Sequence, residues 1–214
     1  MDILNEISEN LQKGKSKIVK ELVGQAIEQG IPAAEILEKG LMAGMNVVGE
    51  KFKKNQVYVP EVLVAARAMN MGAALLKPLL ADGESTSAGK VCIGTVKGDL
   101  HDIGKNLVAM MFKGAGFEVY DLGVDVDAKT FLEKAEEVGA DIIGMSALLS
   151  TTMPAMKELV DLLEEKGLRD KYTVMIGGAP ITDEFAKEIG ADYYTPDAAS
   201  AAEIGKTCVL EKSV

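Results

Sequence analysis

The sequence predicts an α + α/β protein, with a four-helix bundle at residues 1–81, a linker at 82–90 and a parallel-sheet domain at 91–214. In the first segment, apolar residues recur at the spacing of amphipathic helices. In the last segment, short apolar runs typical of buried strands alternate with helical patterns. The polar stretch DGESTSAGK, at 82–90, separates the two patterns and is therefore interpreted as a linker.

Helical spacing in the first segment is clearest over 18–27, 36–52 and 62–76. Pro32 and Pro60 stand where helices can begin, because proline fits the first turn of a helix. Together with the amphipathic start of the chain, these runs predict four helices packed as a bundle.

Five runs in the last segment predict strands, at 91–96, 117–123, 141–147, 173–178 and 192–195. Helices are expected after them, near 103–115, 128–138, 151–166, 182–189 and 198–210. This alternation predicts a flavodoxin-like (Rossmann-type) five-stranded parallel sheet with helices on both faces. Such a sheet binds its ligand beyond the carboxyl ends of the strands, where the strand order reverses.

Composition limits the classes of function. The 33 acidic against 23 basic residues give a net charge of −10, which argues against nucleic acid or an anionic membrane as partner. No signal-peptide pattern and no run of about 18 apolar residues occur, so a cytoplasmic protein without a membrane span is expected. Cys92 and Cys208 lack CxxC spacing, which favours buried thiols over a disulfide or a metal site.

His101 is the one histidine of the chain and follows the first predicted strand. A histidine that binds metal usually donates its second ring N–H to a carboxylate, and Asp99 can supply one. The alternative is a solvent-exposed loop histidine with an aspartate nearby. A single protein ligand suits a metal whose other ligands come from a macrocycle, as in haem or a corrin, and the CxxCH haem signature is absent.

Three short motifs follow three of the predicted strands. Asp99–Gly104 reads Asp-x-His-x-x-Gly; Ser146-Ala147-Leu148 follows after 41 residues (105–145), and Gly177-Gly178 after a further 28 (149–176). Their order and spacing resemble those of cobalamin-binding domains. The resemblance implies a bound corrinoid whose nucleotide tail enters the sheet domain, with a protein histidine as the lower ligand of cobalt.

The bundle adds a second resemblance. MNVVGEKFKKNQVYVPEVLVAARAM, at 45–69, is similar to the helical cap of the methionine synthase cobalamin module and to the corrinoid subunits of anaerobic methyltransferase systems. Cobalamin mutases usually lack this cap, so the resemblance, which spans roughly 15–212, implies a methyl carrier. A B12-dependent sensor or binding module without methyl transfer is the alternative; no helix-turn-helix precedes the cap.

The resemblance implies a role for each motif residue. His101 would bind cobalt, Asp99 would accept its second N–H, and Ser146 would extend that hydrogen-bond chain. The implied cofactor-binding residues are Gly98, Asp99, His101, Asp102, Gly104, Ser146, Leu148, Thr151, Gly177, Gly178, Phe52, Val59 and Val62.

Some of these residues have simpler explanations. Phe52, Val59 and Val62 would cover the upper face of the corrin, or form plain bundle core. Gly177-Gly178 fits a cofactor contact or a tight turn, and Thr151, like its neighbour Thr152, fits a tail contact or a helix cap. Lys97 and Lys105 could meet a phosphate, but solvated side chains are the preferred interpretation.

The cofactor implied is cobalamin or a related corrinoid, alternating between methylcob(III)alamin and cob(I)alamin. The implied partners are a substrate:corrinoid methyltransferase, a corrinoid:tetrahydrofolate or thiol methyltransferase, and a reductive activator protein. The chain alone would be non-catalytic. Gly83 and Gly89 in the linker would let the cap move when a partner docks.

Overall fold

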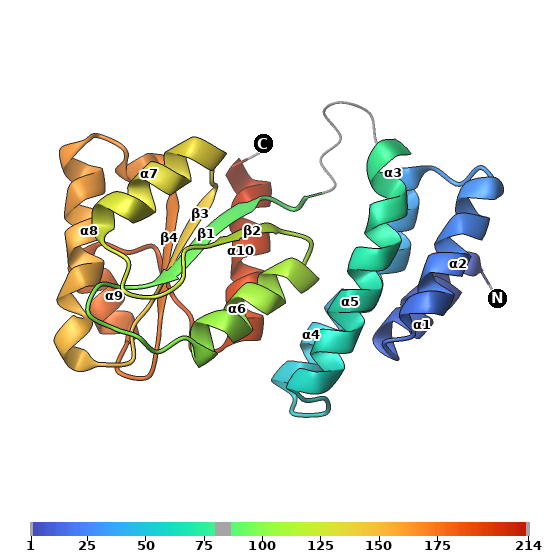
Figure 1. Cartoon of the computed structure of the whole chain (residues 1–214), viewed down its shortest axis with the longest axis horizontal. Helices are drawn as coiled ribbons and strands as arrows, with labels where there is room; N and C mark the ends of the chain where they lie inside the picture. Colours follow the sequence, from blue (N-terminus) through green and yellow to red (C-terminus); the bar gives the residue numbers. More distant parts are fainter. Residues whose placement is uncertain (1, 80–86, 213–214) are drawn as a thin grey trace. The chain divides into compact units, whose positions relative to one another are not determined.

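The structure, a computed structural model, describes residues 2–79 and 87–212. It divides into two compact units, Met1–Ala88 with Lys113–Gly116, and Gly89–Phe112 with Phe117–Val214 (Figure 1). Residues 82–86 of the expected linker, with Gly83, lie outside the described residues, and Lys90 already begins the first strand.

The first unit contains four helical rods, as the sequence predicts. Residues 33–53 form one rod in which a π-helical segment joins two α-helices. Pro32 precedes this rod and Pro60 is the second residue of the last one. The elements are α1 (Ile3–Gln12), α2 (Ser16–Glu28), α3 (Ala33–Glu35), η1 (Ile36–Met42), α4 (Ala43–Lys53), α5 (Val59–Leu76) and η2 (Lys77–Leu79).

Helix α5 is, by length and composition alone, apolar enough to cross a membrane. Glu61 and Arg67 interrupt its sequence, so it is not the unbroken apolar run that the sequence analysis found to be absent. Within the bundle it packs against α2 and α4, with Val62, Ala65 and Met69 among its buried residues. Core helices of soluble bundles meet the same criterion, so the test is weak evidence for a membrane span.

The second unit is built on a five-stranded parallel sheet in the order β2-β1-β3-β4-β5. This order and the parallel pairing confirm the flavodoxin-like prediction. Residues of β1, β3 and β4 are almost all buried, because helices cover both faces of the sheet. The strands are β1 (Lys90–Thr95), β2 (Glu118–Asp121), β3 (Ile142–Ser146), β4 (Thr173–Gly177) and β5 (Tyr193–Tyr194).

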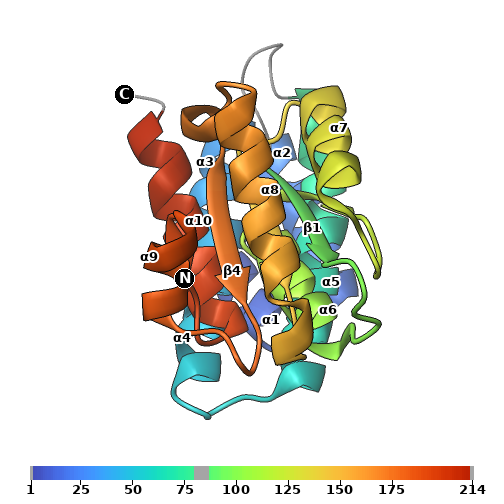
Figure 2. The ribbon, with the colours of Figure 1, turned by 90° about the vertical axis from the view of Figure 1, so that its left-hand side faces the viewer.

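Five α-helices cover the sheet where the sequence predicts them. Helices α6 (Ile103–Gly114) and α10 (Ala198–Lys212) lie on one face (Figure 1). Helices α7 (Ala128–Val138), α8 (Pro154–Glu165) and α9 (Asp183–Ile189) lie on the other face, which is turned toward the viewer in Figure 2. Under this second face, Phe131, Ile143 and Leu159 belong to one buried apolar cluster.

Strand register brings the three sequence motifs to one level of the sheet. Thr95 at the end of β1 pairs with Ser146 at the end of β3, which pairs with Gly177 at the end of β4. The loops that follow these strands therefore leave the same carboxyl edge. The strand order reverses between β1 and β3, so the loop with His101 emerges at the switch point where such folds bind ligands.

Candidate functional site

The centre of the candidate site is the carboxylate of Asp99, which is 0% exposed. Its Oδ2 accepts hydrogen bonds from the main-chain N–H of Leu148 (2.7 Å) and of Leu149 (3.2 Å), and from the Thr152 hydroxyl (3.1 Å). Its Oδ1 accepts from the main-chain N–H of His101 (3.0 Å). The loop after β1 and the loop after β3 are therefore joined through one buried charge.

His101 is the outward-facing member of this network. Its Nδ1 lies 2.7 Å from Asp99 Oδ1, and its side chain is 51% exposed. Because an ionised carboxylate can only accept, Nδ1 carries the proton, and in the neutral ring Nε2 keeps a free lone pair. The arrangement thus presents one oriented imidazole nitrogen to the outside, as the sequence-based interpretation of the Asp-x-His pair expects.

Two opposing effects act on the pKa of Asp99. Burial raises it, while hydrogen bonds from the main chain of His101 and Leu148, from the His101 ring and from the main chain of Leu149 lower it. The hydrogen bonds prevail and hold the pKa of the Asp99 carboxyl well below its usual range. Asp99 is therefore an anion throughout the neutral pH range.

The hydrogen-bond chain of His101 and Asp99 does not continue to Ser146, contrary to expectation. No hydrogen bond joins Ser146 to Asp99 in the described part of the chain; the Thr152 hydroxyl makes that contact instead. Ser146 is the last residue of β3, at the level of the sheet, and the backbone must turn through 147–151 before a side chain reaches Asp99. The main-chain N–H of Leu148, a residue expected at the cofactor, is a direct partner of the carboxylate.

The motif glycines fall into two kinds. At Gly178, φ is +134° and a Cβ would lie 1.8 Å from the carbonyl oxygen of Ala147, so the backbone turn requires glycine. At Gly104, in the first turn of α6, a Cβ would meet nothing within 4 Å. Gly178 thus supports the tight-turn alternative, whereas Gly104 borders open space in which a ligand can approach the helix.

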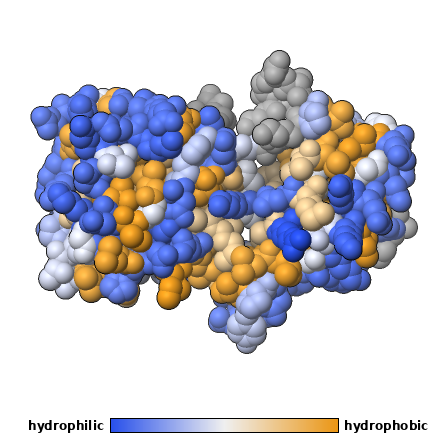
Figure 3. Space-filling model, in the orientation of Figure 1, coloured by the Kyte–Doolittle hydropathy of each residue, from blue (hydrophilic) through white to orange (hydrophobic). Residues whose placement is uncertain are grey.

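Large apolar side chains surround His101 in an exposed position. Leu100 is 71% exposed and Ile103 is 86% exposed, and Leu148 and Leu149 are also exposed. Figure 3 shows apolar areas on the surface of both units. Apolar residues gathered at one edge of a sheet mark a binding surface. Leu100, Ile103 and Leu149 are not among the predicted site residues. For Leu100 and Ile103, an apolar residue close to a loop histidine is a usable sequence signal.

The two lysines of this region behave differently. Lys97 is exposed, as expected. Lys105 is only 3% exposed and its ammonium lies 2.5 and 2.6 Å from the two carboxylate oxygens of Asp121, so the interpretation of a solvated side chain is wrong. The pair connects the first turn of α6 to the end of β2. Its charge is neutralised within the protein and is not offered to a phosphate.

The remaining predicted residues are placed as follows. Asp102 and Thr151 are exposed, and a carboxylate oxygen of Asp102 accepts from the Asn106 side chain at 3.0 Å. In the bundle, Val62 is fully buried, while Phe52 and Val59 are half-buried. Their expected role above a corrin stays a prediction.

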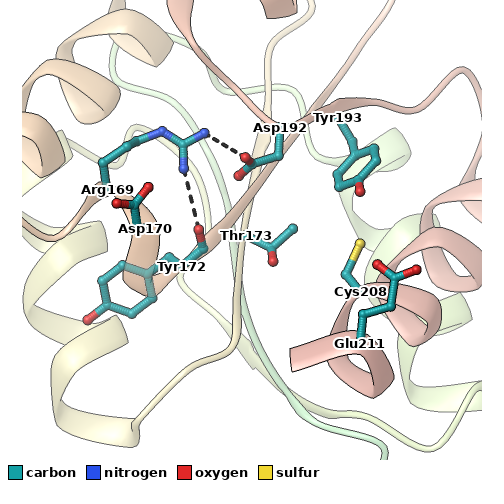
Figure 4. A pocket seen from close by; sticks show the side chains of 8 residues that line it. All are labelled: Arg169, Asp170, Tyr172, Thr173, Asp192, Tyr193, Cys208 and Glu211. Carbon is teal, nitrogen blue, oxygen red and sulfur yellow. Dashed lines mark hydrogen bonds and ion pairs between the residues drawn. The ribbon is translucent and has the colours of Figure 1, made fainter. Parts of the chain in front are cut away.

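A separate hollow of about 410 Å³ opens at the opposite, amino-terminal edge of the sheet, where Thr173 begins β4 (Figure 4). The Arg169 guanidinium lies 2.9 Å from Asp192 and donates to main-chain carbonyls. A hydrogen bond to Cys208 raises the pKa of Tyr193 to about 12, so this phenol stays protonated. None of the predicted site residues lines this hollow.

The residues at the carboxyl edge fit a metal held mainly by a macrocycle. Among residues 2–79 and 87–212, no group of three or more His, Cys, Asp or Glu could hold a metal ion. His101 supplies one nitrogen, Asp99 fixes that ring, and the open space at Gly104 leaves room beside the backbone. One imidazole oriented by a carboxylate would suit a metal whose other ligands come from a macrocycle such as a corrin.

Comparisons with known proteins point to one family. Two family models, each described as a B12 binding domain, match residues 89–203 and 3–77. A corrinoid protein of Desulfitobacterium hafniense (strain Y51) is 44% identical over 207 residues, which are 95% of this chain and 96% of that protein. A dimethylamine corrinoid protein of Methanosarcina barkeri is 47% identical over 206 residues, which are 96% of each chain.

Solved structures show the same architecture. A cobalamin-binding protein from Desulfitobacterium hafniense DCB-2 is 32% identical with a TM-score of 0.79, covering 96% of this chain and 98% of that one. The methanol:cobalamin methyltransferase complex from Methanosarcina barkeri contains a chain that is 30% identical with a TM-score of 0.84, covering 98% of this chain and 80% of that one.

Proposed function

Since this chain belongs to the family of B12-binding corrinoid proteins, we propose that it shuttles a methyl group on its corrinoid between a substrate-specific methyltransferase and a second methyltransferase. The observation that carries the proposal is the exposed His101 ring hydrogen-bonded at Nδ1 to the fully buried Asp99, at the switch point of the sheet. When bound, the corrinoid supplies a cobalt ion that takes up and releases the methyl group.

Asp99 has two tasks in this mechanism. It fixes the tautomer, because Nδ1–H donates to the carboxylate and Nε2 is left as the nitrogen that would bind cobalt. It also fixes the ring in space, because three donors of the loop after β3 hold the other carboxylate oxygen. Little rearrangement is then required when the corrinoid arrives.

Asp99 would keep its position and charge if His101 were to leave the metal. Its Oδ2 is bonded to the Thr152 hydroxyl and to two main-chain N–H groups, which stabilise the carboxylate independently of the His101 ring. The half-exposed His101 ring would then still lie beside an anionic partner.

Apolar and glycine residues complete the cofactor site. Leu100, Ile103 and Leu148 would exclude water from the lower face of the corrin, and Gly98, Gly104 and Gly177 would let the backbone approach its tail. Phe52 and Val59, which are half-buried in the bundle, would shield the upper face between transfers, whereas the fully buried Val62 fits the alternative of plain bundle core. This shielding separates a carrier from a passive binding module.

The proposed partners follow from the same function. A substrate:corrinoid methyltransferase loads the chain, as the structural likeness to the methanol:cobalamin methyltransferase complex suggests. A corrinoid:tetrahydrofolate or thiol methyltransferase unloads it, and a reductive activator protein restores the reduced cofactor. The chain alone has no turnover, and its place is the cytoplasm.

The presence of a single histidine makes a direct test possible. Protein labelled with ¹⁵N-histidine and loaded with hydroxocobalamin is reduced to the cobalt(II) state, and electron paramagnetic resonance reports the axial nitrogen. We expect the hyperfine splitting to change with the label in the parent protein. His101→Ala contains no histidine, so the splitting from a protein nitrogen should be absent from its spectrum. A splitting that ignores the histidine label in the parent protein would refute ligation by His101.

The carrier role has its own test. Protein loaded with hydroxocobalamin, reduced and methylated with iodomethane should keep its methyl group when alone in the dark. It should then release the methyl group to a thiol or tetrahydrofolate only when a methyltransferase is added. Rapid release without an added methyltransferase would contradict the carrier role.

A further inference from the structure

Asp125, which lies between β2 and α7, has a strained backbone with φ of +56°. Asn55 is the one other non-glycine residue with positive φ in the described part of the chain. Asn55 follows the end of α4, and the N–H of Gln56 donates to Lys51 O, a helix-ending pattern in which this conformation is common. Asp125 ends no helix, so its conformation requires another source of stabilisation.

That source is a pair of hydrogen bonds to Gly98 and Asp99, which lie shortly before His101 in the chain. Asp125 Oδ1 accepts from the Gly98 N–H at 2.7 Å, and the Asp125 N–H donates to the Asp99 carbonyl oxygen at 3.0 Å. The left-handed backbone lets the side chain and the main-chain N–H of one residue face the same dipeptide. Asp125 thus holds Gly98–Asp99 at both ends.

The Gly98–Asp99 dipeptide determines the position of His101. The Asp99 side chain bonds both the main-chain N–H and the Nδ1 of His101, and the buried Thr95 hydroxyl donates to the His101 carbonyl oxygen at 2.8 Å. A displacement of the Asp99 main chain would therefore be transmitted to the ring. The Asp125 side chain is itself a partner of Gly98 and makes no bond to His101.

We infer that Asp125 is a positioning residue: by holding the Gly98–Asp99 main chain from the β2–α7 loop, it sets the direction in which His101 presents Nε2. This inference deepens the proposed function and rests on it where His101 is taken as a metal ligand. The claim that Asp125 holds the Gly98–Asp99 main chain in place does not depend on a cofactor.

Two variants separate the effect of the Asp125 carboxylate as an acceptor from the effect of backbone strain at this position. Asp125→Gly adopts positive φ without strain but lacks the acceptor for Gly98. Asp125→Asn keeps a side-chain oxygen and tolerates the left-handed conformation, so it is the matched control. In cofactor-free protein, we expect amide exchange of Gly98, followed by NMR, to be about tenfold or more faster in Asp125→Gly, since a hydrogen bond to a carboxylate is lost. The Asn variant should stay closer to the parent. Equal protection of Gly98 in the parent and Asp125→Gly would overturn the inference.

The second measurement follows His101 itself. Parent and variant proteins are loaded with hydroxocobalamin to equal cofactor content, measured by absorbance, and reduced to cobalt(II). We expect a smaller histidine-ligated fraction in Asp125→Gly, read from the ¹⁵N-histidine dependence of the electron paramagnetic resonance spectrum, and near-parent behaviour in Asp125→Asn. An unchanged fraction in Asp125→Gly would overturn the positioning role. If the parent itself shows no histidine ligation, the proposed function fails, and the amide exchange alone then decides whether Asp125 anchors the loop.

Discussion

Replacing Asp99 by asparagine should lower the free energy of unfolding at pH 7 by about 3 kcal/mol and reverse the tautomer of His101. The buried carboxylate accepts five hydrogen bonds, two at Oδ1 and three at Oδ2. An asparagine can keep only one of these oxygens. If its NH₂ replaced Oδ2, the main-chain N–H groups of Leu148 and Leu149 would both lose their acceptor.

The less costly orientation turns the NH₂ group toward His101. The His101 main-chain N–H then loses a bond to a charged group, worth about 1.5–3 kcal/mol, and the remaining bonds lose their charge assistance. In this orientation Nδ1 must accept from the amide, so the ring proton moves to Nε2. A protonated Nε2 has no lone pair for cobalt, and histidine ligation should be lost while the tail-binding surface stays intact.

The assay is urea unfolding of cofactor-free protein at pH 7 and at several values down to pH 3. Because the folded-state pKa of Asp99 is lowered, its stabilising contribution is complete above the unfolded pKa of about 3.9 and is lost as the pH falls below it. The difference between parent and Asp99→Asn should therefore be constant near neutrality and shrink below about pH 4. Asp102→Asn, an exposed carboxylate in the same loop, is the control and should differ little from the parent. A difference that does not change with pH would refute the reasoning.

Three further predictions concern residues around the site. Gly178→Ala should lower the free energy of unfolding by roughly 3 kcal/mol or more, because its methyl group would lie 1.8 Å from a carbonyl oxygen. Gly104→Ala, with open space around it, should leave the free energy of unfolding unchanged or raise it by up to about 1 kcal/mol, but it should lose corrinoid affinity. Equal unfolding midpoints for these two variants would contradict this assignment. Lys105→Met should lower the free energy of unfolding by about 2 kcal/mol, which is less than for a fully buried pair because Asp121 is 35% exposed. Adding Asp121→Leu should recover most of this stability, because it removes the unpaired carboxylate. A double variant no more stable than Lys105→Met would argue against an unpaired charge as the cause. Burial raises the pKa of Cys92 to about 11, so iodoacetamide at pH 8 should modify it roughly 100-fold more slowly in folded than in urea-unfolded protein, and similar rates would disprove its burial.

The sequence by itself determined the elements and their order. Helical spacing of apolar residues predicted the rods of the bundle, and apolar runs between polar turns predicted all five strands, because both patterns depend on neighbours along the chain. The motif residues around His101, Ser146 and Gly177 were expected at strand ends, and parallel strands bring their carboxyl ends to one edge. Once these strand ends were predicted, only the order of the strands was still needed to locate the expected cofactor site.

Only the tertiary structure decided which groups surround Asp99. Thr152, and not Ser146, donates to the carboxylate, and the main chain of Leu148 and Leu149 supplies two further donors that no side-chain pattern reveals. The same holds for the pair of the buried Lys105 with the partly exposed Asp121, which a sequence presents as two ordinary surface charges. Lys105 and Asp121 are 16 residues apart along the chain, and Asp99 and Thr152 are 53 apart. Their pairing is fixed by loop geometry and strand register to within a few tenths of an ångström, and local sequence patterns do not carry that information.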